Sequence, residues 1–129
     1  MGLQTFDETT PLMQWQEFQP ADTTGIKTIV VVPTDHVRID SVLGNNNDTI
    51  DHVVVLYITV SGADRILGSV TIPTGSGFGA IKAVDVLGAL FPSTVVGFVL
   101  TASFAFRASM VVAVGGSAQV NLWAFGGVV

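Results

Sequence analysis

Most of the chain alternates between apolar and polar positions with a period of two, which is the pattern of β-strands that have one buried face. We expect strands over residues 26–32, 36–43, 53–60, 65–72, 95–106, 109–114 and 117–125. Turn-forming residues separate them: Gly44 with a run of asparagines, Ser61-Gly62, and Gly115-Gly116, which predicts a last tight hairpin. Short strands spaced every ten or so residues predict an all-β, antiparallel β-sandwich, jelly-roll-like or immunoglobulin-like.

One stretch departs from this period. Between Ile81 and Phe91 the apolar residues recur every three to four positions, and Pro92 follows. This spacing predicts a helix of about three turns, the only helix that we expect. A glycine-rich loop, Thr74 to Gly79, precedes it.

Gly75, Gly77 and Ala80 match the G-x-G-x-x-[G/A] pattern that binds dinucleotides between a strand and a helix. Such a site also needs a parallel sheet and an acidic residue about twenty positions further on, yet no Asp or Glu follows Asp85. We therefore interpret the loop as a close-packed corner of the sandwich, in which small residues let the backbone turn.

Residues 1–24 are polar and interrupted by Pro11 and Pro20, but they carry large apolar residues, four of them between residues 12 and 18. We interpret them as an extended N-terminal arm, followed by a sandwich domain over residues 25–129. The apolar side chains are expected to anchor the arm, either over its own sandwich or on a neighbouring subunit. These candidate interface residues are Leu12, Met13, Trp15 and Phe18.

Composition narrows the function. The net charge of -5 argues against a nucleic-acid partner, because phosphate binding needs an excess of Lys and Arg. Charged residues are only 12% of the chain and become rare after Arg65, so we expect other subunits to cover part of the surface. The uncharged run from Val86 to Phe106 is interrupted by Pro92 and rich in β-branched residues, which favours strands over a membrane span.

Catalytic and metal signatures are weak, so we expect no enzyme and no cofactor. The chain has no cysteine and no G-x-S-x-G motif. His36 and His52 are not expected to meet in a zinc site. The asparagine-rich turn offers oxygen atoms that could bind calcium, from Asn45, Asn47, Asp48 and Asp51. Their spacing is not that of an EF-hand, so we favour a solvated turn. An aromatic platform for sugars remains open, formed by Trp15, Tyr57 and Trp123.

The segment from Ile66 to Gly127 resembles the small β-sandwich head decoration, or cement, proteins of tailed bacteriophages. The motifs that carry the resemblance are Gly75–Gly79, Ala83–Leu87 and Ala124–Gly127. The resemblance implies a non-enzymatic virion protein on the capsid surface, bound to the outside of the major capsid protein shell, often as a trimer. The alternative hypothesis is a carbohydrate- or receptor-binding module of a viral spike or fibre.

Overall fold

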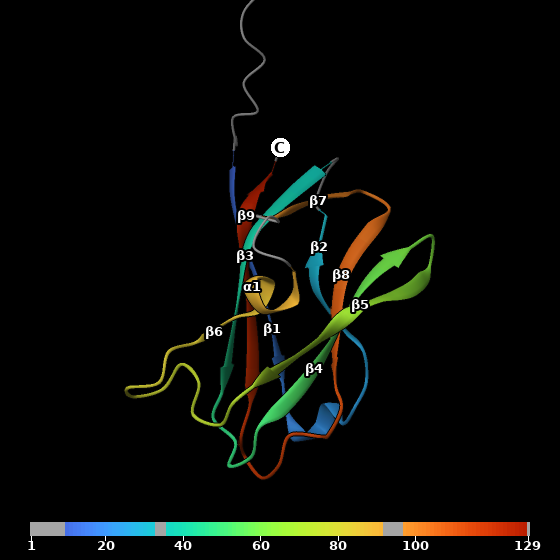
Figure 1. The fold of residues 1–129 in the computed structure, drawn as a ribbon. Coiled ribbons are helices and arrows are strands. Elements are labelled where there is room, and N and C mark those ends of the chain that lie inside the picture. The colour runs from blue at the N-terminus through green and yellow to red at the C-terminus, as the bar shows by residue number, and fades with distance from the viewer. Residues whose placement is uncertain (1–9, 33–35, 92–96, 129) are drawn as a thin grey trace, which may run out of the picture.

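The computed structural model describes residues 10–32, 36–91 and 97–128, which form two antiparallel sheets packed face to face (Figure 1). Sheet A has the order β1 (Thr10–Phe18), β9 (Val120–Val128), β3 (His36–Asn46) and β6 (Val84–Asp85), and β7 (Phe98–Thr101) also pairs with β3. Sheet B has the order β2 (Lys27–Val31), β8 (Phe104–Met110), β4 (His52–Val60) and β5 (Ala63–Ile72). The predicted all-β sandwich is confirmed.

The strands pair in a nested way that makes the sandwich jelly-roll-like. β1 pairs with β9, β2 with β8, β3 with β6 and β7, and β4 with β5. One long antiparallel hairpin, rolled over itself, gives this pattern, with its tip at the β4–β5 turn. The predicted hairpin around Ser61-Gly62 is therefore confirmed.

Two predictions about the connections between strands are wrong. The segment around Gly115-Gly116 does not close a hairpin, because β8 belongs to sheet B and β9 to sheet A, so this loop crosses between the sheets. The strand expected over residues 95–106 is two strands, since the turn at Ala102-Ser103 moves the chain from β7 in sheet A to β8 in sheet B.

The core lies between the sheets and follows the alternation of each strand. In β3, for example, Val37, Ile39 and Val42 are fully buried. Phe98 and Phe106 meet edge to face across the interior, with ring centroids 5.5 Å apart, so the aromatic side of the predicted 95–106 segment does point inward. Burial of each such side chain contributes about 1.5 to 3 kcal/mol to folding.

One open side of the sandwich is closed by side chains that join β1 to β2. The Gln14 amide donates to the carbonyl of Val31 (3.0 Å) and accepts from its N–H (2.8 Å). Gln16 donates to the carbonyl of Thr28, and the Lys27 ammonium donates to the carbonyl of Glu17. The bonds from the two glutamines satisfy backbone groups along the edge of β2, where another strand could otherwise pair.

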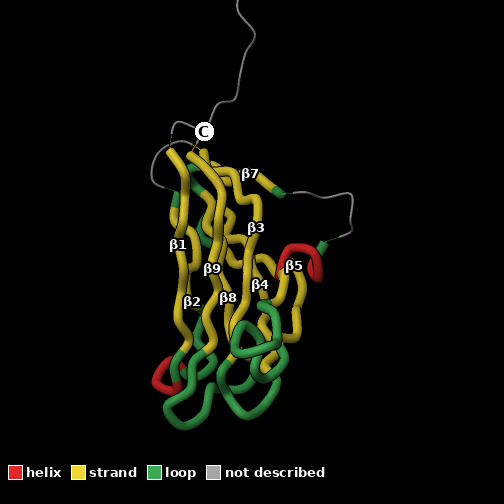
Figure 2. Tube along the Cα trace, turned by 90° about the vertical axis from the view of Figure 1, so that its left-hand side faces the viewer, coloured by secondary structure: helices red, strands yellow, loops and turns green. Residues whose placement is uncertain are grey.

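The opposite side is closed by α1 (Val86–Leu90), which packs against β3 and β5 (Figures 1 and 2). The predicted three-turn helix is wrong in length. Val84 and Asp85 pair with β3 instead, and the Asp85 side chain accepts from the N–H of Gly88, which fixes the start of the helix. A short 3-10 helix, Pro20–Asp22, lies between β1 and β2. No helix within the described ranges is long and apolar enough to cross a membrane.

Candidate functional site

The expected arm residues lie on a strand whose two faces differ. Within residues 1–24, Thr10–Phe18 is β1 and pairs with β9 of the same chain over its whole length, whereas residues 1–9 lie outside the described residues. Leu12 and Phe18 face the core and are 8% and 0% exposed. Met13 and Trp15 face outward and are 60% and 49% exposed. Only two of the four proposed anchors are therefore accessible on this surface.

Strand register places Met13 and Trp15 in an apolar patch on the outer side of sheet A. Met13 of β1 lies beside Phe125 of β9, and Trp123 of β9 lies between Trp15 of β1 and Leu43 of β3. The Trp15 and Trp123 rings stack, with centroids 5.3 Å apart and planes inclined by 26°. We call this surface the aromatic face and define it by five side chains: Met13, Trp15, Leu43, Trp123 and Phe125.

Polar residues bound the aromatic face at both ends. On one side the next outward row is Glu17, Asn121 and Asn45. On the other side lies Arg38, whose guanidinium pairs with both carboxylate oxygens of Asp40, at 2.6 and 3.0 Å. An apolar centre with a polar rim is the usual anatomy of a protein-binding surface.

The glycine-rich loop between β5 and β6 projects beyond the outer side of sheet A, at the lower left in Figure 1. Three of its backbone amides donate within the protein: Gly75 to the Asn46 carbonyl, Gly77 to that of Ile81, and Phe78 to that of Gly75. A phosphate group would need these N–H groups. The bonds argue against a phosphate site and tie the Gly75–Ser76 part of the loop to the end of β3.

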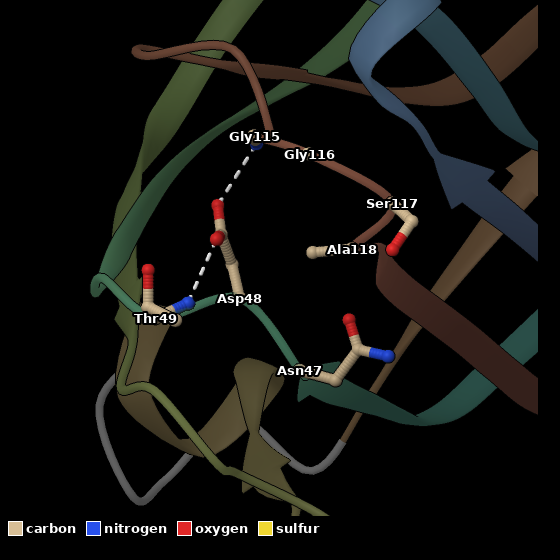
Figure 3. Close-up of a pocket in the computed structure, with 7 residues that line it drawn as sticks. All are labelled: Asn47, Asp48, Thr49, Gly115, Gly116, Ser117 and Ala118. Carbon is tan, nitrogen blue, oxygen red and sulfur yellow. Dashed lines mark hydrogen bonds between the residues drawn. The ribbon is translucent and has the colours of Figure 1, made fainter.

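A second candidate site is an open hollow of about 380 Å³ at the end of the sandwich where the loops meet. Figure 3 shows seven residues that line it: Asn47, Asp48, Thr49, Gly115, Gly116, Ser117 and Ala118. Asp48 Oδ1 accepts from the Thr49 N–H (2.7 Å), and Oδ2 accepts from the Gly115 N–H (3.0 Å) and lies 2.7 Å from His52 Nε2. The carboxylate thus ties the β3–β4 loop to the β8–β9 loop.

These contacts stabilise the charged form of Asp48. The Gly115 N–H and the His52 ring, in that order, lower the pKa of the carboxyl from 3.8 to about 2. The His52 side chain is fully buried, and its Nδ1 has no hydrogen-bond partner. Asn46 completes the cluster, because its amide donates to the carbonyls of Ile50 and Ile72. These hydrogen bonds hold the β3–β4 loop against the β8–β9 loop, and we call the arrangement the Asp48 clasp.

The metal candidates considered from the sequence separate in space. His36 is exposed at the start of β3 in sheet A, whereas His52 is buried at the start of β4 in sheet B. Asp51 accepts from the Thr74 N–H. In the part of the chain that the structure describes, no group of three or more His, Cys, Asp or Glu residues could hold a metal ion.

The structure brings together two members of the expected aromatic platform and separates the third. Trp15 and Trp123 stack on sheet A, whereas the Tyr57 hydroxyl lies 3.0 Å from Ser109 Oγ on sheet B. Leu43 and Phe125 were not expected in this surface. Their outward positions follow from the pairing of β3 with β9, which residue spacing alone does not reveal.

No family model matches the chain, and no curated protein matches it. Among solved structures, it is similar to a chain in the acidic stable capsid structure of Helicobacter pylori bacteriophage KHP30, with a TM-score of 0.50, 12% identity, and coverage of 94% of this chain and 90% of that chain. It also matches the nucleoplasmin-like N-terminal domain of Drosophila FKBP39, with a TM-score of 0.43, 13% identity, and coverage of 95% and 94%. The phage capsid chain shares the overall fold.

Proposed function

We propose that this chain is a non-enzymatic structural protein of a virion. Specifically, it acts as a decoration or cement protein that binds the outside of the major capsid protein shell and stabilises it through subunit interfaces. It acts as a homo-oligomer, with a trimer as the favoured form.

The aromatic face is the observation that carries this proposal. Five large apolar side chains stand in adjacent rows on one sheet, and Met13 and Trp15 are about half exposed or more. Exposed patches with a polar rim mark interaction sites. Aromatic residues and Met are enriched at the centres of protein interfaces. The jelly-roll-like fold, shared with the phage capsid chain, and the low content of charged residues agree with a protein that acts through its surface.

Sedimentation with assembled shells of candidate capsid proteins tests the proposal. We expect the wild-type protein to pellet with a shell and Trp15→Glu to remain in the supernatant, because the substitution places a charge at the centre of the aromatic face and disrupts the subunit contacts made there. Ile66→Glu is the matched control, since Ile66 is 69% exposed on β5 of the other sheet. Equal pelleting of the Trp15 variant and the wild type would contradict the proposal.

The stacked tryptophans favour one second candidate, a carbohydrate-binding module. Trp15 is half exposed, and its ring offers an apolar surface on which a sugar can stack. A glycan array separates the two functions. Specific glycan binding that is lost in Trp123→Ala but retained in Tyr57→Ala would support the sugar-binding module. Shell binding without any glycan signal would support the virion protein.

A further inference from the structure

We propose that residues 1–9 of one copy cover the aromatic face of a second copy of this chain. The inference deepens the homo-oligomeric part of the proposed function and rests on it. It names the surface that joins the copies and the segment that binds there.

The aromatic face offers too little area to hold two whole subunits together by itself. Five side chains of this kind, already packed on a sheet, expose on the order of a few hundred Å². A standard stable interface buries about 800 Å² on each partner. A short peptide segment, which is tethered to its own subunit, is an occupant of suitable size for such a patch.

Residues 1–9 have the length and the composition of such an occupant. When extended, they span about 30 Å, at about 3.3 Å per residue. The two rows of the aromatic face lie two residues apart along each strand, and the face is three strands wide, so it measures only about 10 Å across. The segment includes three large apolar residues, Met1, Leu3 and Phe6.

The direction of β1 favours a second copy over the same chain. β1 remains paired with β9 up to Thr10, opposite Val128, and Pro11 restrains the backbone there. Followed toward its N-terminus, the strand therefore points away from its own Met13 and Trp15. A return to its own aromatic face needs a chain reversal within residues 1–9, whereas a copy placed beyond the end of β1 receives the segment without one.

The two tryptophans of the chain provide a direct readout, because both lie on the aromatic face. We expect the wild-type protein to have a native mass that is a multiple of 13.5 kDa. Deletion of residues 2–9, or the double substitution Leu3→Asp with Phe6→Asp, is expected to reduce the mass to one chain. Both changes are expected to shift tryptophan emission to longer wavelength. The matched control, Gln4→Asp with Thr5→Asp, adds the same charge and should keep the oligomer.

Engineered cysteines distinguish a second copy from the same chain, and the natural chain has no cysteine to interfere. One variant carries Phe6→Cys, and another carries Ser41→Cys beside Phe125 on the aromatic face. A disulfide between the two mixed variants supports the proposal. A disulfide formed only within a single chain that carries both substitutions overturns it, as does a wild-type monomer. A monomer that still pellets with shells would overturn this inference and the homo-oligomeric part of the proposed function, and would leave binding to the shell standing.

Discussion

Replacement of Asp48 by Asn tests whether the loops at the end of the sandwich are held by the charged Asp48 clasp. The carboxylate accepts hydrogen bonds from the N–H groups of Thr49 and Gly115 and pairs with the buried His52. An Asn amide keeps one acceptor oxygen, but its NH₂ group faces a donor at one of these positions and leaves it unsatisfied. We expect Asp48→Asn to fold and to be less stable.

The expected loss of stability follows from the pKa of Asp48, which is lowered from 3.8 to about 2. One pKa unit corresponds to about 1.4 kcal/mol, so the folded protein gains about 2 to 3 kcal/mol from the charged carboxylate. Because the pKa is lower in the folded state, this stabilisation is complete above pH ~4 and disappears as the pH falls toward 2. The pKa of Asp22 and that of Asp64 are also lowered, by hydrogen bonds from Lys27 and Thr59, so only the difference between variant and wild type isolates Asp48.

The assay is urea denaturation at pH 7, 5, 3 and 2. We expect Asp48→Asn to lose about 2 to 3 kcal/mol of unfolding free energy at pH 7 and the difference from wild type to shrink toward zero at pH 2. Asp51→Asn is the matched control, because its exposed carboxylate accepts a single N–H, from Thr74. A difference that stays the same across this pH range, or a loss in the control as large as in Asp48→Asn, would refute the reasoning.

Three further predictions concern stability and use the same denaturation assay. Leu12→Ala should lower the unfolding free energy by about 2 to 4 kcal/mol and Met13→Ala by less than about 1 kcal/mol, because the Leu12 side chain is buried and that of Met13 is exposed. Equal losses would contradict the assignment of the two faces of β1. Gln14→Ala should cost about 1 to 2 kcal/mol by leaving the N–H and carbonyl of Val31 without their partners, and an unchanged midpoint would argue against this closure of the edge. Gly77→Ala should destabilise the protein more than Gly79→Ala. Both residues have positive φ, but a Cβ at Gly77 would clash with the Asn45 side chain, whereas a Cβ at Gly79 meets nothing within 4 Å. Equal effects would show that the loop is not packed closely there.

The sequence predicts the fold class because strand alternation is a local property. Val53–Val60 and Arg65–Ile72 read as strands joined by a turn, and they pair in that way. Which sheet receives a strand is not local. Turns rich in Gly and Asn occur both in hairpins within one sheet and in connections between two sheets. The sequence near Asn47 and Gly116 therefore could not show that the chain crosses to the other sheet there.

The sequence did not show that β1 is a strand of the sandwich, because of its two glutamines. Leu12, Gln14, Gln16 and Phe18 share the inward side, and two polar residues there obscure the apolar period. These glutamines are tolerated inside because they bond to the backbone edge of β2, a partner that the β1 sequence does not specify. The aromatic face was predicted only in part: Trp15 was predicted as a candidate interface residue, but its contact with Trp123 depends on the pairing of distant strands. The expected arm therefore remains a proposal for residues 1–9.

The native mass of the purified protein, measured alone and then with candidate shell proteins, tests the central claim most directly. We predict an oligomer of 13.5 kDa chains that joins an assembled shell and is carried to the mass of the shell. A stable monomer with no affinity for any protein shell would contradict the claim that this sandwich acts as a structural component of a virion.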